Sequence, residues 1–278
     1  MEQKISISNW RFAGSLGRSG LPRGCNDLMT IHPFEIIGAD RDSPWLVTCD
    51  HASNHVPPAI LPGGLGISKC DINRHIAYDL GASGLARALA AALQAPAILS
   101  QFSRLVIDPN RGEQDPTLLM RLYDGTIIPG NRHAGPAERE RRLALLYRPY
   151  HAALAALAAR RPDRVILAIH SFTPFLRGRP PRPWQVGVLY SPLDARLSRP
   201  LIALLQAEPG LCVGDNEPYA GHLPGDAIDR HALQQGRHNT LIELRQDLIA
   251  DAPSQLAWAI RLAPILRAAL QQSLDKPS

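Results

Sequence analysis

The chain has 278 residues, of which 45% are hydrophobic and 20% are charged, and its formal net charge is +5. This length suits one full-sized domain with a deep core. No run of about 18 apolar residues occurs, so we expect no transmembrane helix. Basic residues are scattered and only 5% of residues are aromatic, which argues against a nucleic-acid surface and fits a small anionic ligand held by a few arginines.

The amino-terminal residues do not resemble a targeting signal, because Met1–Ile5 contain no apolar segment. Residues 1–30 are polar and rich in glycine, and we interpret them as a flexible arm ahead of a single domain over residues 31–278. No two cysteines form a C-x-x-C pair, which argues against a zinc ribbon and predicts reduced thiols in a cytoplasmic protein. The four cysteines are Cys25, Cys49, Cys70 and Cys212.

Short apolar runs have the length and composition of buried strands. They cover residues 45–49, 97–100, 104–108, 165–169, 186–190 and 240–244. Longer segments carry apolar residues at helical spacing. They are 73–94, 136–160, 194–207 and 252–271. Strands that are apolar throughout and separated by helices are typical of a mostly parallel sheet covered on both faces. The sequence therefore predicts a single α/β domain.

Polar side chains follow the predicted strands at several places. His51 comes just after the first strand, Asp108 and Arg111 follow the third, and His170 follows the fourth. Glu243 lies in the last strand. In open α/β sheets functional groups collect at the carboxyl ends of the strands, so we expect these side chains to meet at one edge.

Two histidines from different strands suit a metal ion, because neutral imidazole is a good zinc ligand and a catalytic zinc usually has three protein ligands. The third ligand is open. Asn54 stands where an H-x-x-E pair beginning at His51 would place its glutamate, and an amide is a poor zinc ligand. Asp79 is the preferred candidate and Asp50 is the reserve. In the alternative interpretation, His51 and His170 are hydrogen-bonded core residues.

Glu243 is a single carboxylate within an apolar run, and burying a carboxylate is costly unless it is paired or used. One interpretation makes it a general base that takes a proton from water and passes it to a leaving amine. The other makes it the partner of a buried ion pair with Arg245 or Arg230.

Arg111 offers a planar fork for a substrate carboxylate or a developing oxyanion. In the alternative interpretation it forms an ion pair within the scaffold, with Asp108 or Glu113. Arg104 has the same two interpretations.

Six segments, taken in order, resemble the successive conserved blocks of the N-formylglutamate amidohydrolase family. They are Cys49–Pro57, His75–Ala82, Val106–Arg111, Ile169–Pro174, Asn216–Gly221 and Ile242–Ile249. Each block alone is weak, but the ordered set is specific and spans about residues 45–250. The resemblance implies a fold related to the zinc carboxypeptidases, with a mixed sheet flanked by helices. It also implies a zinc-dependent enzyme that releases formate and glutamate in histidine degradation.

The resemblance also implies roles for individual residues. His51 and His170 match the metal-binding histidines, and Glu243 matches the catalytic glutamate. Asn110-Arg111 resembles the Asn-Arg pair that holds the substrate carboxylate in carboxypeptidase-like enzymes. Further substrate-binding candidates are Arg104, Asn216, Tyr219, Arg230, His238 and Arg245. The best-known members read Pro-His-Ser-Gly where this chain reads Asp50-His51-Ala52-Ser53, which indicates a divergent branch.

The expected substrate is a small N-acyl amino acid with a carboxylate, and its acyl group and amino acid stay open. One alternative is a hydrolase of the same chemistry that acts on another N-acyl amino acid or on a peptide. A second alternative is a protein that binds N-acyl amino acids without turning them over. The presence of His51, His170 and Glu243 favours an enzyme.

Overall fold

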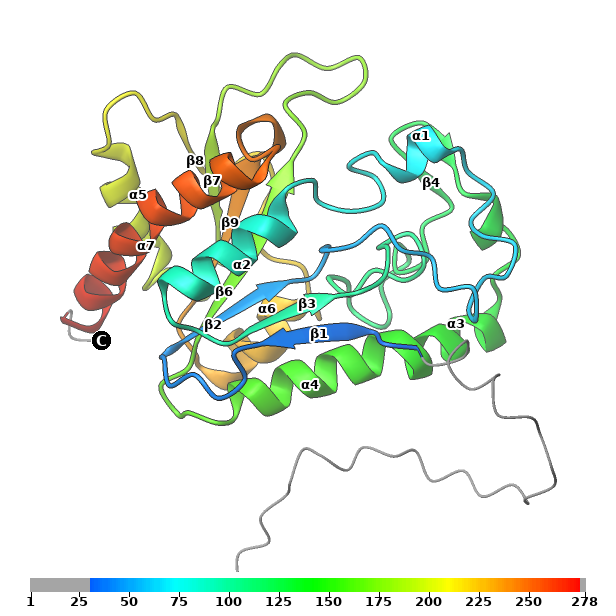
Figure 1. The fold of residues 1–278 in the computed structure, drawn as a ribbon, viewed down its shortest axis with the longest axis horizontal. Coiled ribbons are helices and arrows are strands. Elements are labelled where there is room, and N and C mark those ends of the chain that lie inside the picture. The colour runs from blue at the N-terminus through cyan, green and yellow to red at the C-terminus, as the bar shows by residue number, and fades with distance from the viewer. Residues whose placement is uncertain (1–30, 276–278) are drawn as a thin grey trace, which may run out of the picture. The chain divides into compact units, whose positions relative to one another are not determined.

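A computed structural model describes residues 31–275, and the arm expected over residues 1–30 lies outside them. Its centre is a seven-stranded sheet with the order β1-β3-β2-β6-β9-β7-β8 (Figure 1). The strands are β1 (Phe34–Ile37), β2 (Trp45–Cys49), β3 (Ala97–Ser100), β6 (Val165–Phe172), β7 (Val186–Leu189), β8 (Val213–Asp215) and β9 (Asn239–Arg245). Strands β3, β2, β6 and β9 run parallel, whereas β1 is antiparallel to β3 and β7 to β9. The predicted α/β class with a mostly parallel mixed sheet is confirmed.

Helices cover both faces of this sheet. The helices are α1 (Lys69–Ile72), α2 (Ala82–Ala92), α3 (Pro136–Arg142), α4 (Arg148–Ala158), α5 (Ser198–Gln206), α6 (Ala227–His231) and α7 (Ala252–Asp275). One buried cluster joins α2, α5 and α7 to the sheet, and a second joins α4 and α6 to its other face. In Figure 1, α2 and α7 lie side by side, and α4 runs along the opposite side. A π-helical turn, Leu143–Tyr147, links α3 to α4.

The two faces of β6 show how sequence alternation sorts the layers, because successive strand side chains point to opposite faces. Leu167 and Ile169 belong to the cluster under α2 and α7, whereas Ile166 and Ala168 belong to the cluster under α4. The strand continues to Phe172, three residues beyond its predicted end. His170 therefore lies within the strand, on the α4 face, instead of following it.

The strand predicted over residues 104–108 is wrong, because this apolar segment forms a buried turn. The carbonyl of Leu105 accepts a hydrogen bond from Asn131 Nδ2, and that of Val106 accepts one from Arg142 Nη1, each at 2.7 Å. Side chains thus satisfy backbone groups that a strand would pair with a neighbouring strand. The segment is apolar because it fills a core beside the sheet.

The helix predicted over residues 73–94 is too long, because α2 begins only at Ala82. Gly81 precedes it with φ of 79°, and a β-carbon there would lie 2.2 Å from the carbonyl oxygen of Ile249. Only glycine fits this left-handed, crowded position. Asp79 consequently lies in an irregular turn just before the helix.

Several short elements were not predicted. They are the sheet strands β1 and β8, the helices α1 and α6, the hairpin strands β4 (Leu122–Tyr123) and β5 (Thr126–Ile127), and the 3₁₀ turns Pro129–Asn131, Leu233–Gln235 and Gln246–Leu248. Most of these elements are too short to show a periodic pattern, since only a few residues define each.

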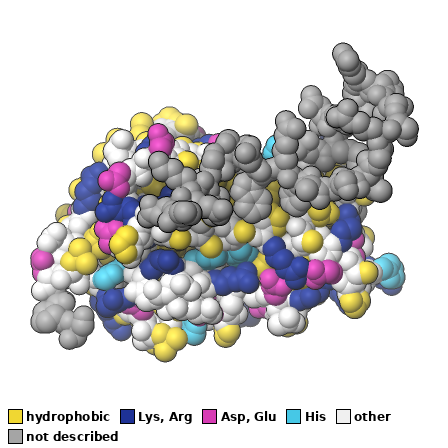
Figure 2. Space-filling model, turned by 90° about the horizontal axis from the view of Figure 1, so that it is seen from below, with side chains coloured by type: hydrophobic (Ala, Val, Ile, Leu, Met, Phe, Trp, Pro, Cys, Tyr) yellow, Lys and Arg dark blue, Asp and Glu magenta, His cyan; other side chains and the backbone are white. Residues whose placement is uncertain are grey.

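Lys and Arg side chains are interspersed with Asp and Glu on the face in Figure 2, where the atoms not drawn in grey form no continuous basic surface. Within residues 31–275, every helix is too short or too polar to span a bilayer.

Arg142 is fully buried, and it donates to the Val106 carbonyl, to Asn131 Oδ1 and to Glu138 Oε1, each at 2.7 Å. We expect Arg142→Met to lower the free energy of unfolding by about 3–5 kcal/mol, because it leaves buried acceptors without a donor. Chemical denaturation measures the change, with the exposed Arg132→Met as control. Equal stability of the two variants would contradict this assignment.

Candidate metal centre and active site

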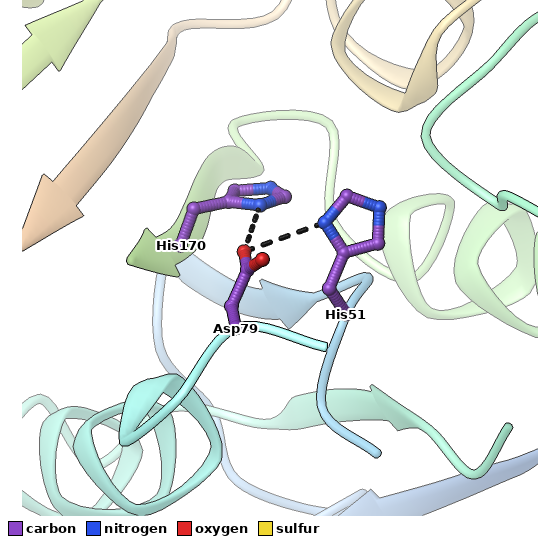
Figure 3. A group of neighbouring side chains, drawn as sticks. All are labelled: His51, Asp79 and His170. Atoms are coloured by element: carbon purple, nitrogen blue, oxygen red, sulfur yellow. Dashed lines mark hydrogen bonds and ion pairs between the residues drawn. The ribbon is translucent and has the colours of Figure 1, made fainter. Parts of the chain in front are cut away.

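Three buried side chains from separate parts of the chain meet at the carboxyl end of the sheet (Figure 3). His51 follows β2, Asp79 precedes α2, and His170 lies in β6. Asp79 Oδ2 is 2.8 Å from His170 Nδ1 and 3.3 Å from His51 Nδ1. The amide of Asp79 also donates to the His51 carbonyl at 3.0 Å, which holds the two segments together. One ligand atom from each residue lies within 4.8 Å of the others, as a single metal ion requires.

Each histidine has a second carboxylate behind it. His51 Nε2 lies 2.7 Å from Asp108 Oδ1, and His170 Nε2 lies 3.7 Å from Asp50 Oδ2. Asp50 in turn accepts a hydrogen bond from the Tyr150 hydroxyl. A metal-binding histidine usually donates its other N–H to a carboxylate or carbonyl, and this fixes which nitrogen is free for the metal. Asp108 fixes the His51 ring in this way, whereas His170 Nε2 and Asp50 Oδ2 are too far apart for a hydrogen bond. Both Nδ1 atoms face the shared Asp79 carboxylate.

The donor atoms of this group suit a divalent metal. His51 has a carboxylate at each ring nitrogen, Asp79 at Nδ1 and Asp108 at Nε2. A metal held by Nδ1 would leave the Nε2 N–H to donate to Asp108. Two imidazole nitrogens and one carboxylate oxygen also form a common ligand set of catalytic zinc.

The pKa shifts in this group favour an ionised carboxylate. Burial raises the pKa of Asp79, but the charges of His51 and His170 outweigh it, and the pKa of Asp79 lies well below its usual range. Asp79 is therefore available as an anionic ligand at neutral pH. Asp50, the reserve candidate, lies on the Nε2 side of His170, behind the ring.

Glu243 lies beside this group because of strand register. It pairs with His170 across β6 and β9 and with Gly187 across β9 and β7, and adjacent strands are about 4.8 Å apart. Its side chain is 7% exposed, and its Oε2 has no hydrogen-bond partner in the described part of the chain. Burial raises the pKa of Glu243 to about 7, against the lowering effect of the His170 charge. A carboxylate in this state can accept a proton near neutral pH.

The ion pairs considered for Glu243 are not formed. Arg245 Nε bonds Asp247 at 2.8 Å, and Arg230 Nη2 lies 3.5 Å from Glu113. Arg230 also lies 5.3 Å over the Tyr147 ring. Both arginines thus have other acidic partners, and Glu243 is left to face the histidines.

Arg104 is buried within the candidate site. Its Nη2 donates to Asp108 Oδ2 at 2.9 Å, and its Nη1 lies 3.5 Å from Asp79 Oδ1. Its guanidinium also lies 5.4 Å from the centre of the Tyr123 ring. Arg104 therefore offsets the charge of the two carboxylates that serve the histidines.

The Asn110-Arg111 pair lies on the loop that begins at Asp108. Asn110 Oδ1 accepts from the Ala227 amide at 3.3 Å. Arg111 donates from Nη1 to the Asn110 carbonyl at 2.8 Å and from Nε to Thr117 at 3.2 Å. Among residues 31–275 no carboxylate pairs with Arg111, so the scaffold ion pair considered for it is not formed.

The later candidates divide into two groups. Asn216 Oδ1 accepts from the amides of Tyr190 and Gly221, at 2.9 and 3.2 Å, and so holds the loop that carries Tyr219. This loop passes over Gly187, the strand partner of Glu243 on β7. A β-carbon on Gly187 would lie 2.1 Å from the Glu217 carbonyl oxygen, so only glycine lets the loop come this close. Burial and the Glu243 charge raise the pKa of Tyr219 to about 12.

His238 is not brought to this group. Its carbonyl accepts from the Ile166 amide at 2.9 Å, at the amino end of β6. It lies five residues before Glu243 in the chain, roughly 16 Å at about 3.3 Å per residue.

The supporting residues Asp50, Asp108 and Tyr150 were not assigned these roles from the sequence. For Asp50 and Asp108 the available sequence signal was position, since Asp50 precedes His51 and Asp108 precedes Asn110-Arg111.

The sequence model of the N-formylglutamate amidohydrolase family matches residues 43–250 of this chain. The chain belongs to the N-formylglutamate amidohydrolase family. The matched residues include the His51–Asp79–His170 group and Glu243. No curated protein sequence matches the chain significantly.

Solved structures share this fold. A gene product of Agrobacterium tumefaciens matches with a TM-score of 0.82 and 34% identity, over 88% of this chain and 96% of that chain. The N-formylglutamate amidohydrolase of Ralstonia eutropha JMP134 matches with a TM-score of 0.62 and 23% identity, over 87% and 98%. A metallo-carboxypeptidase from Pseudomonas aeruginosa matches with a TM-score of 0.37 and 13% identity, over 82% and 57%, which is too distant to carry an inference.

We expect Asp108→Asn to weaken zinc binding about 10- to 100-fold, because the carboxylate that accepts from His51 Nε2 is lost. Competition against a chelating dye measures the affinity. Asp163→Asn, which removes an exposed carboxylate paired with Arg161, is the control. If both variants bind zinc equally well, Asp108 does not support the metal centre.

Proposed function

We propose that this chain is a zinc-dependent amidohydrolase that removes a formyl or other small acyl group from an N-acyl amino acid, with N-formyl-L-glutamate as the first candidate. Family membership supports hydrolysis of a linear amide. The observation that carries the proposal is the register of β6 and β9, which aligns the buried, unpaired Glu243 with His170 of a three-residue metal-binding group.

The proposed division of roles follows the contacts of each side chain. Zinc held by His51, Asp79 and His170 would supply a Lewis acid for the acyl carbonyl and for the attacking water. Glu243 takes a proton from that water and delivers it to the leaving amine nitrogen. Arg111 stabilises the developing oxyanion, since its guanidinium has only a threonine and its own loop as partners among the described residues.

Tyr219 is proposed to line the acyl pocket, because its loop passes over Gly187, the strand partner of Glu243. Asn110 and Asn216 are proposed to act indirectly, by holding the loops that carry Arg111 and Tyr219. Release of formate and an amino acid would serve amino-acid catabolism, as in histidine degradation. A cytoplasmic location is supported by Cys49, Cys70 and Cys212, which form no disulfide with one another within residues 31–275.

The reaction is tested by formate release from N-formyl-L-glutamate, with zinc added and after chelation. We expect release that requires zinc. Stoichiometric zinc without any release would move the proposal to another N-acyl substrate. Absence of zinc binding would instead favour a protein that binds N-acyl amino acids without turning them over.

Two variants test the assigned roles. We expect His170→Ala to lose both bound zinc and activity, because one of three ligands is removed. We expect Glu243→Gln to keep zinc and to lower kcat by about 10²- to 10⁴-fold, because the amide cannot accept the proton. Metal analysis and steady-state kinetics measure both effects, with the surface variants His133→Ala and Glu208→Gln as matched controls. Near-normal turnover by Glu243→Gln would rule out the general-base role.

A further inference from the structure

We propose that Arg182 is a substrate-binding residue that pairs with a carboxylate of the N-acyl amino acid and so determines specificity for acidic substrates. The inference rests on the proposed function and adds a residue to the same site. Arg182 lies between β6 and β7, in a segment to which sequence analysis assigned no role.

Arg182 lies over the end of the strand that carries His170. Its guanidinium carbon is 5.7 Å from the centre of the Phe172 ring. Phe172 is two residues beyond His170, so both side chains point to the same face of β6, about 6.6 Å apart along the strand. The backbone holds this position, because the Arg182 amide donates to the Pro174 carbonyl at 2.7 Å and the Arg182 carbonyl accepts from Arg245 at 3.4 Å.

Tyr219 also contacts the guanidinium of Arg182. The guanidinium carbon lies 4.9 Å from the centre of the Tyr219 ring, and Nη1 donates to the Tyr219 hydroxyl at 3.0 Å and to the Thr173 carbonyl at 3.2 Å. Within residues 31–275, the Nε and Nη2 N–H groups of Arg182 have no hydrogen-bond partner. One edge of the planar fork is therefore oriented and still available, and this edge suits a bidentate carboxylate.

Arg182 differs from the neighbouring arginines in its ion pairing. Arg104, Arg230 and Arg245 each pair with an aspartate or glutamate. Arg182 is half-buried and has no acidic partner in the described part of the chain. A partly desolvated cation without a counter-ion gains more from a ligand anion than one whose charge is already neutralised.

The spacing along β6 is compatible with the length of the substrate. His170 and Phe172 are about 6.6 Å apart along the strand, which the few bonds between a scissile amide and a carboxylate can span. The α-carboxylate and a side-chain carboxylate both satisfy this chemistry, and substrate analogues separate them.

The test compares kcat/KM on N-formyl-L-glutamate with that on its α-carboxamide and its side-chain carboxamide. We expect Arg182→Met to lose about 10- to 100-fold on the diacid, mainly through KM, because a hydrogen-bonded charge pair is removed. On the carboxamide that lacks the carboxylate bound by Arg182, Arg182→Met should lower kcat/KM only slightly. The carboxamide that shows this small loss identifies the carboxylate that Arg182 binds. Arg182→Lys keeps the charge without the fork and should fall in between.

Arg199→Met is the matched control, because Arg199 also lies over a tyrosine, 5.2 Å from the centre of the Tyr190 ring, but on the exposed surface beside Asp215. Equal losses by Arg182→Met on the diacid and on both carboxamides would overturn the inference and leave the proposed function standing. If the wild-type protein hydrolyses none of the three compounds, N-formyl-L-glutamate is ruled out as its substrate and the inference about Arg182 fails with it.

Discussion

A single buried carboxylate oxygen organises the candidate site. Asp79 Oδ2 faces Nδ1 of His51 at 3.3 Å and Nδ1 of His170 at 2.8 Å. Burying one carboxylate among apolar side chains would cost several kcal/mol, so the surrounding charges have to compensate. Arg104 and the two imidazoles provide that compensation, and a divalent metal would complete it. The geometry of the site therefore follows from the need to neutralise Asp79 in the absence of bulk water.

The sheet brings a further carboxylate, Glu243, beside His170 of this group. His170 and Glu243 occupy matched positions on β6 and β9, on the face that also packs against α4. Toward the amino end of the sheet the same rows hold Ile166, Ala168 and Leu241, which bury apolar surface. One face of one sheet thus changes from hydrophobic core to polar site within two residues, and the core beneath keeps His170 and Glu243 in register.

Much of the sheet could be predicted from sequence, because apolar runs such as 165–169 are typical of strands in a sheet that is covered on both faces. Residues 104–108 show the limit of that argument. Their apolar pattern reports burial, but whether a buried backbone pairs with a strand or with side chains depends on residues far away in sequence, here Asn131 and Arg142. The helix start at Ala82 was similarly missed because the crowding at Gly81 comes from Ile249.

The sequence by itself determined the α/β class, the residue types of a metal-dependent hydrolase and the resemblance to the N-formylglutamate amidohydrolases, since these depend on local pattern and on ordered motifs. Only the tertiary structure decided which polar residues share one site. It placed Asp79 between the two histidines, set Asp108 and Asp50 behind them, separated His238 from Glu243 and brought the unassigned Arg182 over Phe172. The physical reason is that such contacts depend on strand register and loop packing, which join residues distant in the chain.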